Sequence, residues 1–210
     1  MTAAAGVLLA LTLVSAAIDW MAVHHGHQAM RYVFKPLTLV LLTATALALD
    51  PDDPTVRTWF VVALVMSLAG DVFLMLPGDL FVPGLGSFLL AHVAYIVGLV
   101  LSGLEPVGVL VGLAVVAVAF ALVGARIVAG VRRSEPALGP PVLAYMGVIS
   151  AMLVCAIGTG APLAIAGAVL FYASDALIGW GRFVEARPWG DLAVMVTYHL
   201  GQVLLVLFLV

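Results

Sequence analysis

Charged residues are scarce in this sequence. Only 9% of its 210 residues are Asp, Glu, Lys or Arg, whereas 65% are hydrophobic and the mean hydropathy is +1.26. A soluble domain carries roughly 25% charged residues, so this chain has too few charges to cover a surface in water. We therefore expect an integral membrane protein.

Basic residues, cysteines and long polar segments are also few. Eight Lys and Arg residues and a formal net charge of −3 leave no basic patch for nucleic acid. The single cysteine, Cys155, excludes an intramolecular disulfide and any metal or redox site built from several cysteines. Residues 1–18 contain no Lys or Arg, so we expect a retained first span and not a cleaved signal peptide.

Apolar segments of membrane-spanning length are what the sequence does contain. A spanning helix needs about 20 mostly apolar residues, and dividing the chain at charges, prolines and glycines predicts eight such helices. They comprise residues 3–18, 32–49, 58–76, 84–102, 106–131, 141–159, 162–180 and 189–209. The expected fold is all-α, with one transmembrane domain over residues 1–210 and short loops between antiparallel neighbours.

Basic residues gather in every second loop. The odd-numbered loops and the helix ends beside them hold seven Lys and Arg residues, whereas the even-numbered loops hold only Arg57. Under the positive-inside rule, this bias predicts a cell-membrane protein with its odd loops in the cytoplasm and both termini on the outer side.

Asp71 and Asp175 are the two acidic residues embedded in apolar sequence. An ionisable group inside a span costs about 2.5–3.5 kcal/mol and marks a functional site by default. The alternative is an interhelical hydrogen bond that only fixes packing. Both aspartates fall in the predicted cytoplasmic half of their helices, where other polar side chains are also expected. These are Lys35, His92, Tyr95, Tyr145, Tyr198, His199 and Gln202.

Helical spacing and helix ends support a shared pocket. His92 and Tyr95 are three residues apart, and Tyr198 and Gln202 four, so each pair shares one helix face. Lys35 lies near the predicted start of its helix, where a cation opposes the helix dipole. A lipid phosphate would explain it; a lysine extending to the headgroups is the alternative. The one-sided placement predicts a pocket open to the cytoplasmic leaflet.

Two weaker patterns concern repetition and metal binding. An Asp is followed by a His 21 residues later at Asp71 and 24 residues later at Asp175, which hints at a 4+4 parallel repeat. His24, His25 and His27 have Asp19 as their only nearby carboxylate and no nearby Cys, so we expect no metal site there.

Several motifs, in order along the chain, carry a family resemblance. They are Lys35-Pro36, Gly70-Asp71-Val-Phe-Leu-Met75, the segment from Gly84 through His92 to Tyr95, Tyr172-Ala-Ser-Asp175 with Arg182-Phe183, and Thr197-Tyr198-His-Leu-Gly-Gln202. Together they resemble the YhhN family of lysoplasmalogenase-like membrane proteins. The resemblance implies an eight-helix enzyme that hydrolyses the vinyl ether bond of lysoplasmalogens to a fatty aldehyde and a glycerophosphoethanolamine or glycerophosphocholine. It also places the family's two essential aspartates at Asp71 and Asp175.

Such chemistry needs a proton donor, an anion that stabilises a cationic intermediate, and a positioned water. Two carboxyl groups can supply this, much as in a glycosidase, so we expect no metal or other cofactor. The expected substrate is a lysophospholipid in the cytoplasmic leaflet, with its phosphate at Lys35. Water or the glycerol hydroxyl would be positioned by His92, Tyr95, Tyr198, His199 and Gln202. The sequence leaves open which aspartate is the acid.

Two other classes of protein could use the same aspartates. A proton-coupled carrier of lipids or small solutes also shows paired intramembrane carboxylates and repeats. It needs access from both sides, however, and the predicted outer halves of the helices are almost purely aliphatic. A structural protein with a polar packing network would explain the aspartates but not the one-sided placement.

Overall fold

The computed structural model describes residues 2–210, and helices are the secondary structure of that part of the chain. The α-helices are α1 (Ala3–His24), α2 (Gln28–Ala48), α3 (Pro54–Met75), α4 (Phe81–Leu101), α5 (Pro106–Ala119), α6 (Ala125–Ser134), α7 (Gly139–Gly158), α8 (Pro162–Phe183) and α9 (Gly190–Leu207). A π-helical turn, η1 (Phe120–Gly124), joins α5 to α6, and a 3-10 turn, η2 (Pro136–Leu138), precedes α7.

Eight helical segments are long and apolar enough to cross a membrane. The fifth is continuous through α5, η1 and α6 and runs from Pro106 to Ser134. Prolines begin several of these helices, where their missing N–H is no loss. The Asp53 side chain accepts a hydrogen bond from the Thr55 N–H at the start of α3, which lowers the pKa of Asp53. The predicted eight-helix, all-α membrane fold is confirmed.

Two helix boundaries differ from the prediction in ways that matter for function. Helix α1 continues to His24, so Asp19 lies inside the helix and not after it. Helix α2 begins at Gln28, which places Lys35 two turns inside it. The prediction that Lys35 lies at a helix N-terminus is therefore wrong. Lys35 is paired with Asp71 inside the bundle, so its charge does not mark a helix boundary.

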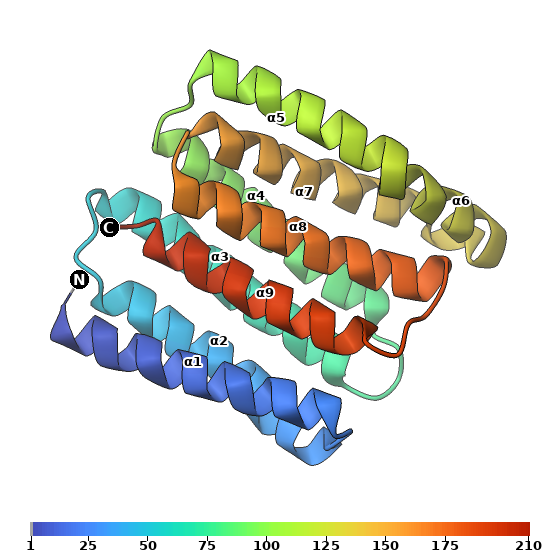
Figure 1. The fold of residues 1–210 in the computed structure, drawn as a ribbon, viewed down its shortest axis with the longest axis horizontal. Coiled ribbons are helices and arrows are strands. Elements are labelled where there is room, and N and C mark those ends of the chain that lie inside the picture. The colour runs from blue at the N-terminus through green and yellow to red at the C-terminus, as the bar shows by residue number, and fades with distance from the viewer. Residues whose placement is uncertain (1) are drawn as a thin grey trace.

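The helices form a bundle with α1 and α2 at one edge and α5 at the opposite edge (Figure 1). Most consecutive helices pack as antiparallel hairpins, but α5 packs on α7 and not on α4; α2 also contacts α9, and α7 contacts α4. The loops at 25–27, 76–80 and 184–189 lie at one end of the bundle, together with the turn between α6 and α7. We call this the basic end, because seven of the eight Lys and Arg residues lie at or near it.

The outward faces of the helices are apolar. Large hydrophobic side chains such as Val107, Leu110 and Leu122 on the fifth segment are well exposed, as suits contact with lipid chains. Buried aromatic residues fill the middle of the bundle between α3, α4, α8 and α9, among them Phe60, Tyr95 and Phe171. The chain is a multi-pass membrane protein in which polar side chains such as Asp71, His92 and Gln202 are buried between the helices.

Candidate functional site

Asp71 on α3 lies in a closed polar cluster near the basic end. Its Oδ1 lies 3.1 Å from the Lys35 Nζ of α2, and its Oδ2 accepts a 2.8 Å hydrogen bond from the Tyr198 hydroxyl of α9. The side chains of Lys35 and Asp71 are only 7% and 2% exposed. We call these three residues the Asp71 centre; its carboxylate has both a cation and a neutral donor.

Asp175 on α8 lies in a second cluster with different partners. The Tyr145 hydroxyl of α7 donates a hydrogen bond to its Oδ2, and the His92 Nε2 of α4 lies 3.7 Å from the same oxygen. No Lys or Arg among residues 2–210 forms an ion pair with Asp175. Its side chain is 12% exposed. We call Asp175, Tyr145 and His92 the Asp175 centre.

Aromatic rings lie between the two centres. The Phe171 ring is 5.3 Å from the Tyr198 ring and 4.8 Å from the His92 ring, so it touches one member of each centre. The Phe88 ring is 5.8 Å from that of Tyr198 and also packs on Phe171. Gly70 allows this approach, because a Cβ there would meet the Phe88 ring at 2.6 Å. Two buried aromatic rings, those of Phe88 and Phe171, therefore separate the aspartates.

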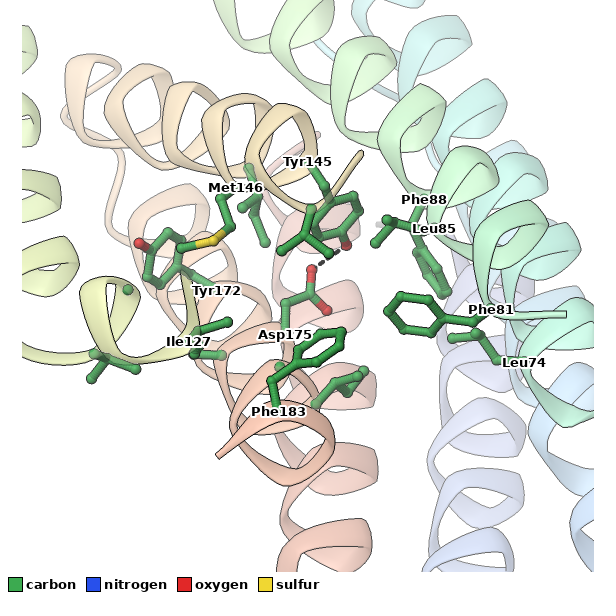
Figure 2. A pocket seen from close by; sticks show the side chains of 17 residues that line it. Leu74, Phe81, Leu85, Phe88, Ile127, Tyr145, Met146, Tyr172, Asp175 and Phe183 are labelled. Atoms are coloured by element: carbon green, nitrogen blue, oxygen red, sulfur yellow. Dashed lines mark hydrogen bonds between the residues drawn. The ribbon is translucent and has the colours of Figure 1, made fainter. Parts of the chain in front are cut away.

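An apolar hollow opens beside Asp175. Its walls come from the basic-end halves of α3, α4, α7 and α8 and from the η1–α6 segment, and they include Phe81, Leu85, Phe88, Ile127, Met146 and Phe183. Figure 2 shows the Asp175 carboxyl group in the middle of these side chains, bonded to Tyr145. The hollow therefore combines apolar walls with one carboxyl group.

Arg182 closes one side of this hollow at the basic end. It donates hydrogen bonds to Asp79 at 3.0 and 3.1 Å and to Glu135 at 3.2 and 3.0 Å. Its guanidinium group also lies 4.0 Å from the centre of the Phe81 ring, which lines the hollow. Arg182 thus ties the α3–α4 loop, the end of α6 and α8 together around the rim.

The structure divides the predicted site residues into several groups. Lys35, Asp71 and Tyr198 meet in one centre, and His92 joins Asp175 in the other. The Tyr95 hydroxyl donates to the Gln202 Oε1 instead of to either aspartate, and the His199 Nδ1 accepts a 3.0 Å hydrogen bond from the indole N–H of Trp20. The Nε2 atoms of His199 and Gln202 are buried without a protein partner.

Two residues of the polar interior were assigned no role from the sequence. Tyr145 was expected in the same half of the helices as the aspartates, and the structure makes it the donor to Asp175. Asp19 was taken to follow its helix, yet it is fully buried within α1. The apolar residues after it, Trp20 to Val23, were the signal that the helix continues.

Comparison with known proteins places this architecture in a family. The family model described as the YhhN family matches residues 30–209, which include both centres and the walls of the hollow. The chain belongs to the YhhN family. No solved structure matches it.

Named relatives come from bacteria and mammals. Proteins called lysoplasmalogenase from Mycobacterium bovis and Mycobacterium tuberculosis are 34% identical to this YhhN-family chain over 186 residues, which is 86% of this chain and 70% of theirs. Human lysoplasmalogenase TMEM86B is 34% identical over 145 residues, or 69% of this chain and 60% of the human protein.

Proposed function

We propose that this chain is a lysoplasmalogenase, which hydrolyses the vinyl ether bond of a lysoplasmalogen to a fatty aldehyde and a glycerophospho-ethanolamine or -choline. The observation that carries the proposal is the position of Asp175, a carboxyl group at the wall of an apolar hollow with no Lys or Arg ion-pair partner within residues 2–210. The names of its relatives give the substrate class.

Asp175 is the proton donor in this proposal. In apolar surroundings a carboxyl group without a cationic neighbour is more stable in its neutral, protonated form. A chain bound in the hollow would bring its first double bond, which is the vinyl ether, against this proton. The hollow lies in the same half of the bundle as both aspartates. The hydrocarbon chain and the vinyl ether of the lipid would therefore lie at the same depth in the membrane as the aspartates.

The reaction needs one proton and one water. The Asp175 carboxyl group donates its proton to the vinyl carbon farther from the ether oxygen, and the other vinyl carbon becomes part of an oxocarbenium ion. Water adds to that carbon, and the Asp175 carboxylate takes up a proton from the water. The resulting hemiacetal breaks its bond to the glycerol oxygen, and the hydroxyl proton passes to that oxygen. His92 and Tyr145, the neighbours of Asp175, position the water.

The Lys35 ammonium keeps Asp71 in its anionic form. This anion stabilises the oxocarbenium ion from the other side of the Phe88 and Phe171 rings. The Lys35 ammonium has three donors, of which one serves Asp71, so the others are available to the lipid phosphate. The glycerol hydroxyl forms hydrogen bonds with the free Nε2 atoms of His199 and Gln202. Tyr95 holds Gln202 in place, and Tyr198 holds Asp71. We place the basic end, and hence the substrate, at the cytoplasmic leaflet.

The test is hydrolysis of lysoplasmenylethanolamine by the purified protein in detergent, measured as aldehyde release. We expect Asp175→Asn and Asp71→Asn each to lower kcat by roughly 10²- to 10⁴-fold. Asp52→Asn, an exposed loop carboxylate, is the matched control and should match the wild type. In D2O the aldehyde should carry one deuterium on the carbon next to its carbonyl. No aldehyde from the folded wild type, or full activity in Asp175→Asn, would refute the proposal.

A further inference from the structure

Asp19 is a third carboxyl group in the polar interior, and the proposed reaction does not use it. It lies five residues before the end of α1, and its exposed fraction is 0%. Neither of its oxygens has a hydrogen-bond partner, and no ion pair involving it occurs within residues 2–210. A buried charged group without a partner is costly, which points to a ligand.

The neighbouring cations leave Asp19 unpaired. Lys35 on the facing helix α2 is directed to Asp71, with its Nζ at 3.1 Å from that carboxylate. Arg31 lies one helical turn before Lys35, and its Nε is also buried without a partner. The Asp19 carboxylate and the Arg31 Nε are therefore both without a partner among residues 2–210, although Arg31 also donates to Gln28 through its Nη1. The two side chains form no ion pair with each other there. A zwitterion placed between them would satisfy both.

We infer that Asp19 binds the primary ammonium group of an ethanolamine headgroup, with the lipid phosphate held at Lys35 and Arg31. This inference rests on the proposed function and names the headgroup that it prefers. A primary ammonium has three N–H donors to offer the two free carboxylate oxygens, and such charge-assisted bonds are strong. A trimethylammonium group has none, so the same carboxylate favours ethanolamine over choline.

Hydrogen bonds of the residues around Asp19 fix this part of α1 to its neighbouring helices. The Trp20 indole N–H donates to the His199 Nδ1 at 3.0 Å, which fixes the end of α1 to α9. One turn earlier, the Ser15 hydroxyl bonds to the Phe34 carbonyl and receives a hydrogen bond from Thr38 on α2. These bonds hold the Asp19 segment against both neighbouring helices, so its carboxylate is a rigid acceptor.

Binding of non-hydrolysable lipids tests the inference without requiring catalysis. The probes are three alkyl ether lysolipids: the phosphoethanolamine, the phosphocholine and the amine-free glycerophosphate, titrated onto the protein in detergent micelles. We expect the wild type to bind the ethanolamine lipid roughly 10- to 100-fold more tightly than the amine-free lipid. Asp19→Asn should bring that ratio close to one, and Asp19→Glu should restore part of it. Asp52→Asn should leave the ratio as in the wild type.

Several results would overturn the inference. Equal wild-type affinity for the ethanolamine and amine-free lipids would do so without any variant, as would a choline lipid that binds as tightly as the ethanolamine lipid. Equal weakening of all three lipids by Asp19→Asn would show a purely structural role. Amine-dependent binding in a protein that releases no aldehyde would instead refute the proposed hydrolysis and leave the headgroup site standing.

Discussion

Asp71 and Asp175 occupy matching places in the two halves of the bundle but have unlike partners. Each receives one contact from the preceding helix, Lys35 on α2 or Tyr145 on α7, and one from the last helix of the other half. This arrangement is what a 4+4 duplication predicts, although the duplication itself stays a prediction.

Both partners differ: Asp71 has Lys35 and Tyr198, whereas Asp175 has Tyr145 and His92. The difference in charge comes from Lys35 in one half and Tyr145 in the other. A lysine holds its aspartate as an anion, whereas a phenol leaves its aspartate free to carry a proton. The Asp71 centre is closed, and the Asp175 centre faces the hollow. We propose that these different neighbours give the two carboxyl groups opposite tasks, as different surroundings do for the two carboxyl groups of glycosidases.

The largest expected effect comes from making the second centre resemble the first. Tyr145→Lys would place a cation beside Asp175 and hold it as an anion, so we expect kcat to fall by roughly 10³-fold. Tyr145→Phe removes one hydrogen bond but leaves Asp175 without a cation, so it should retain much more activity. Aldehyde release by both variants measures the contrast, and a Phe variant as inactive as the Lys variant would contradict it.

Breaking the ion pair of the first centre should act on stability. Lys35→Met leaves the Asp71 carboxylate buried and unpaired, and we expect a loss of about 3–5 kcal/mol in the free energy of unfolding. The double variant Lys35→Met/Asp71→Asn should be more stable than Lys35→Met, because it removes the uncompensated charge. Denaturation in detergent of the wild type, Lys35→Met, Asp71→Asn and the double variant gives the four values. Additive losses would show that the two side chains do not interact.

A larger side chain in the hollow should weaken binding of the lipid's hydrocarbon chain. Ala176 lines the hollow next to Asp175, and Ala176→Phe would take up part of its volume. We expect KM for a long-chain lysoplasmalogen to rise roughly 10-fold, with a smaller rise for a short-chain one, since a few methylenes account for such a factor. KM measured across a series of chain lengths tests this. A uniform rise for all lengths would show that the chain binds elsewhere.

The smallest effect is expected at the rim. The Arg182 hydrogen bonds lower the pKa of Asp79. A carboxylate with a lowered pKa in the folded state adds stability above its unfolded pKa, and that stability is lost as the pH falls through the folded value. Asp79→Asn should therefore lower Tm slightly at pH 7, and the difference should vanish well below pH ~4. A difference in Tm that persists there would rule out the ion pair as its cause.

The sequence predicted the fold well because hydrophobic length sets membrane helices almost alone. It also selected Asp71, Asp175 and Lys35, since charges inside apolar sequence stand out. It could not separate the roles of the aspartates, because that depends on which helices touch. Lys35 and Tyr145 each lie on the helix before that of their aspartate, and no rule of residue spacing links either of them to Asp71 or Asp175.

Asp19 was missed for the opposite reason. A carboxylate near the end of an apolar run is usually the point where the chain leaves the membrane, and here the helix continues past it for five residues. Tyr95 and Gln202 show a further limit of sequence patterns. Both have the expected helix faces, yet they bond to each other across α4 and α9, and only the packing of helices decides that choice.

The π-helical turn Phe120–Gly124 bears on how relatives should be aligned. In a π turn each N–H bonds to the carbonyl five residues earlier, one residue farther back than in an α turn, so the turn takes in an additional residue without forming a loop. Its last two residues, Val123 and Gly124, line the hollow together with Ile127. A relative whose fifth span is wound as a regular α-helix would show a one-residue gap here. That gap would record a change of winding inside a membrane span, with the residues beyond it still in register.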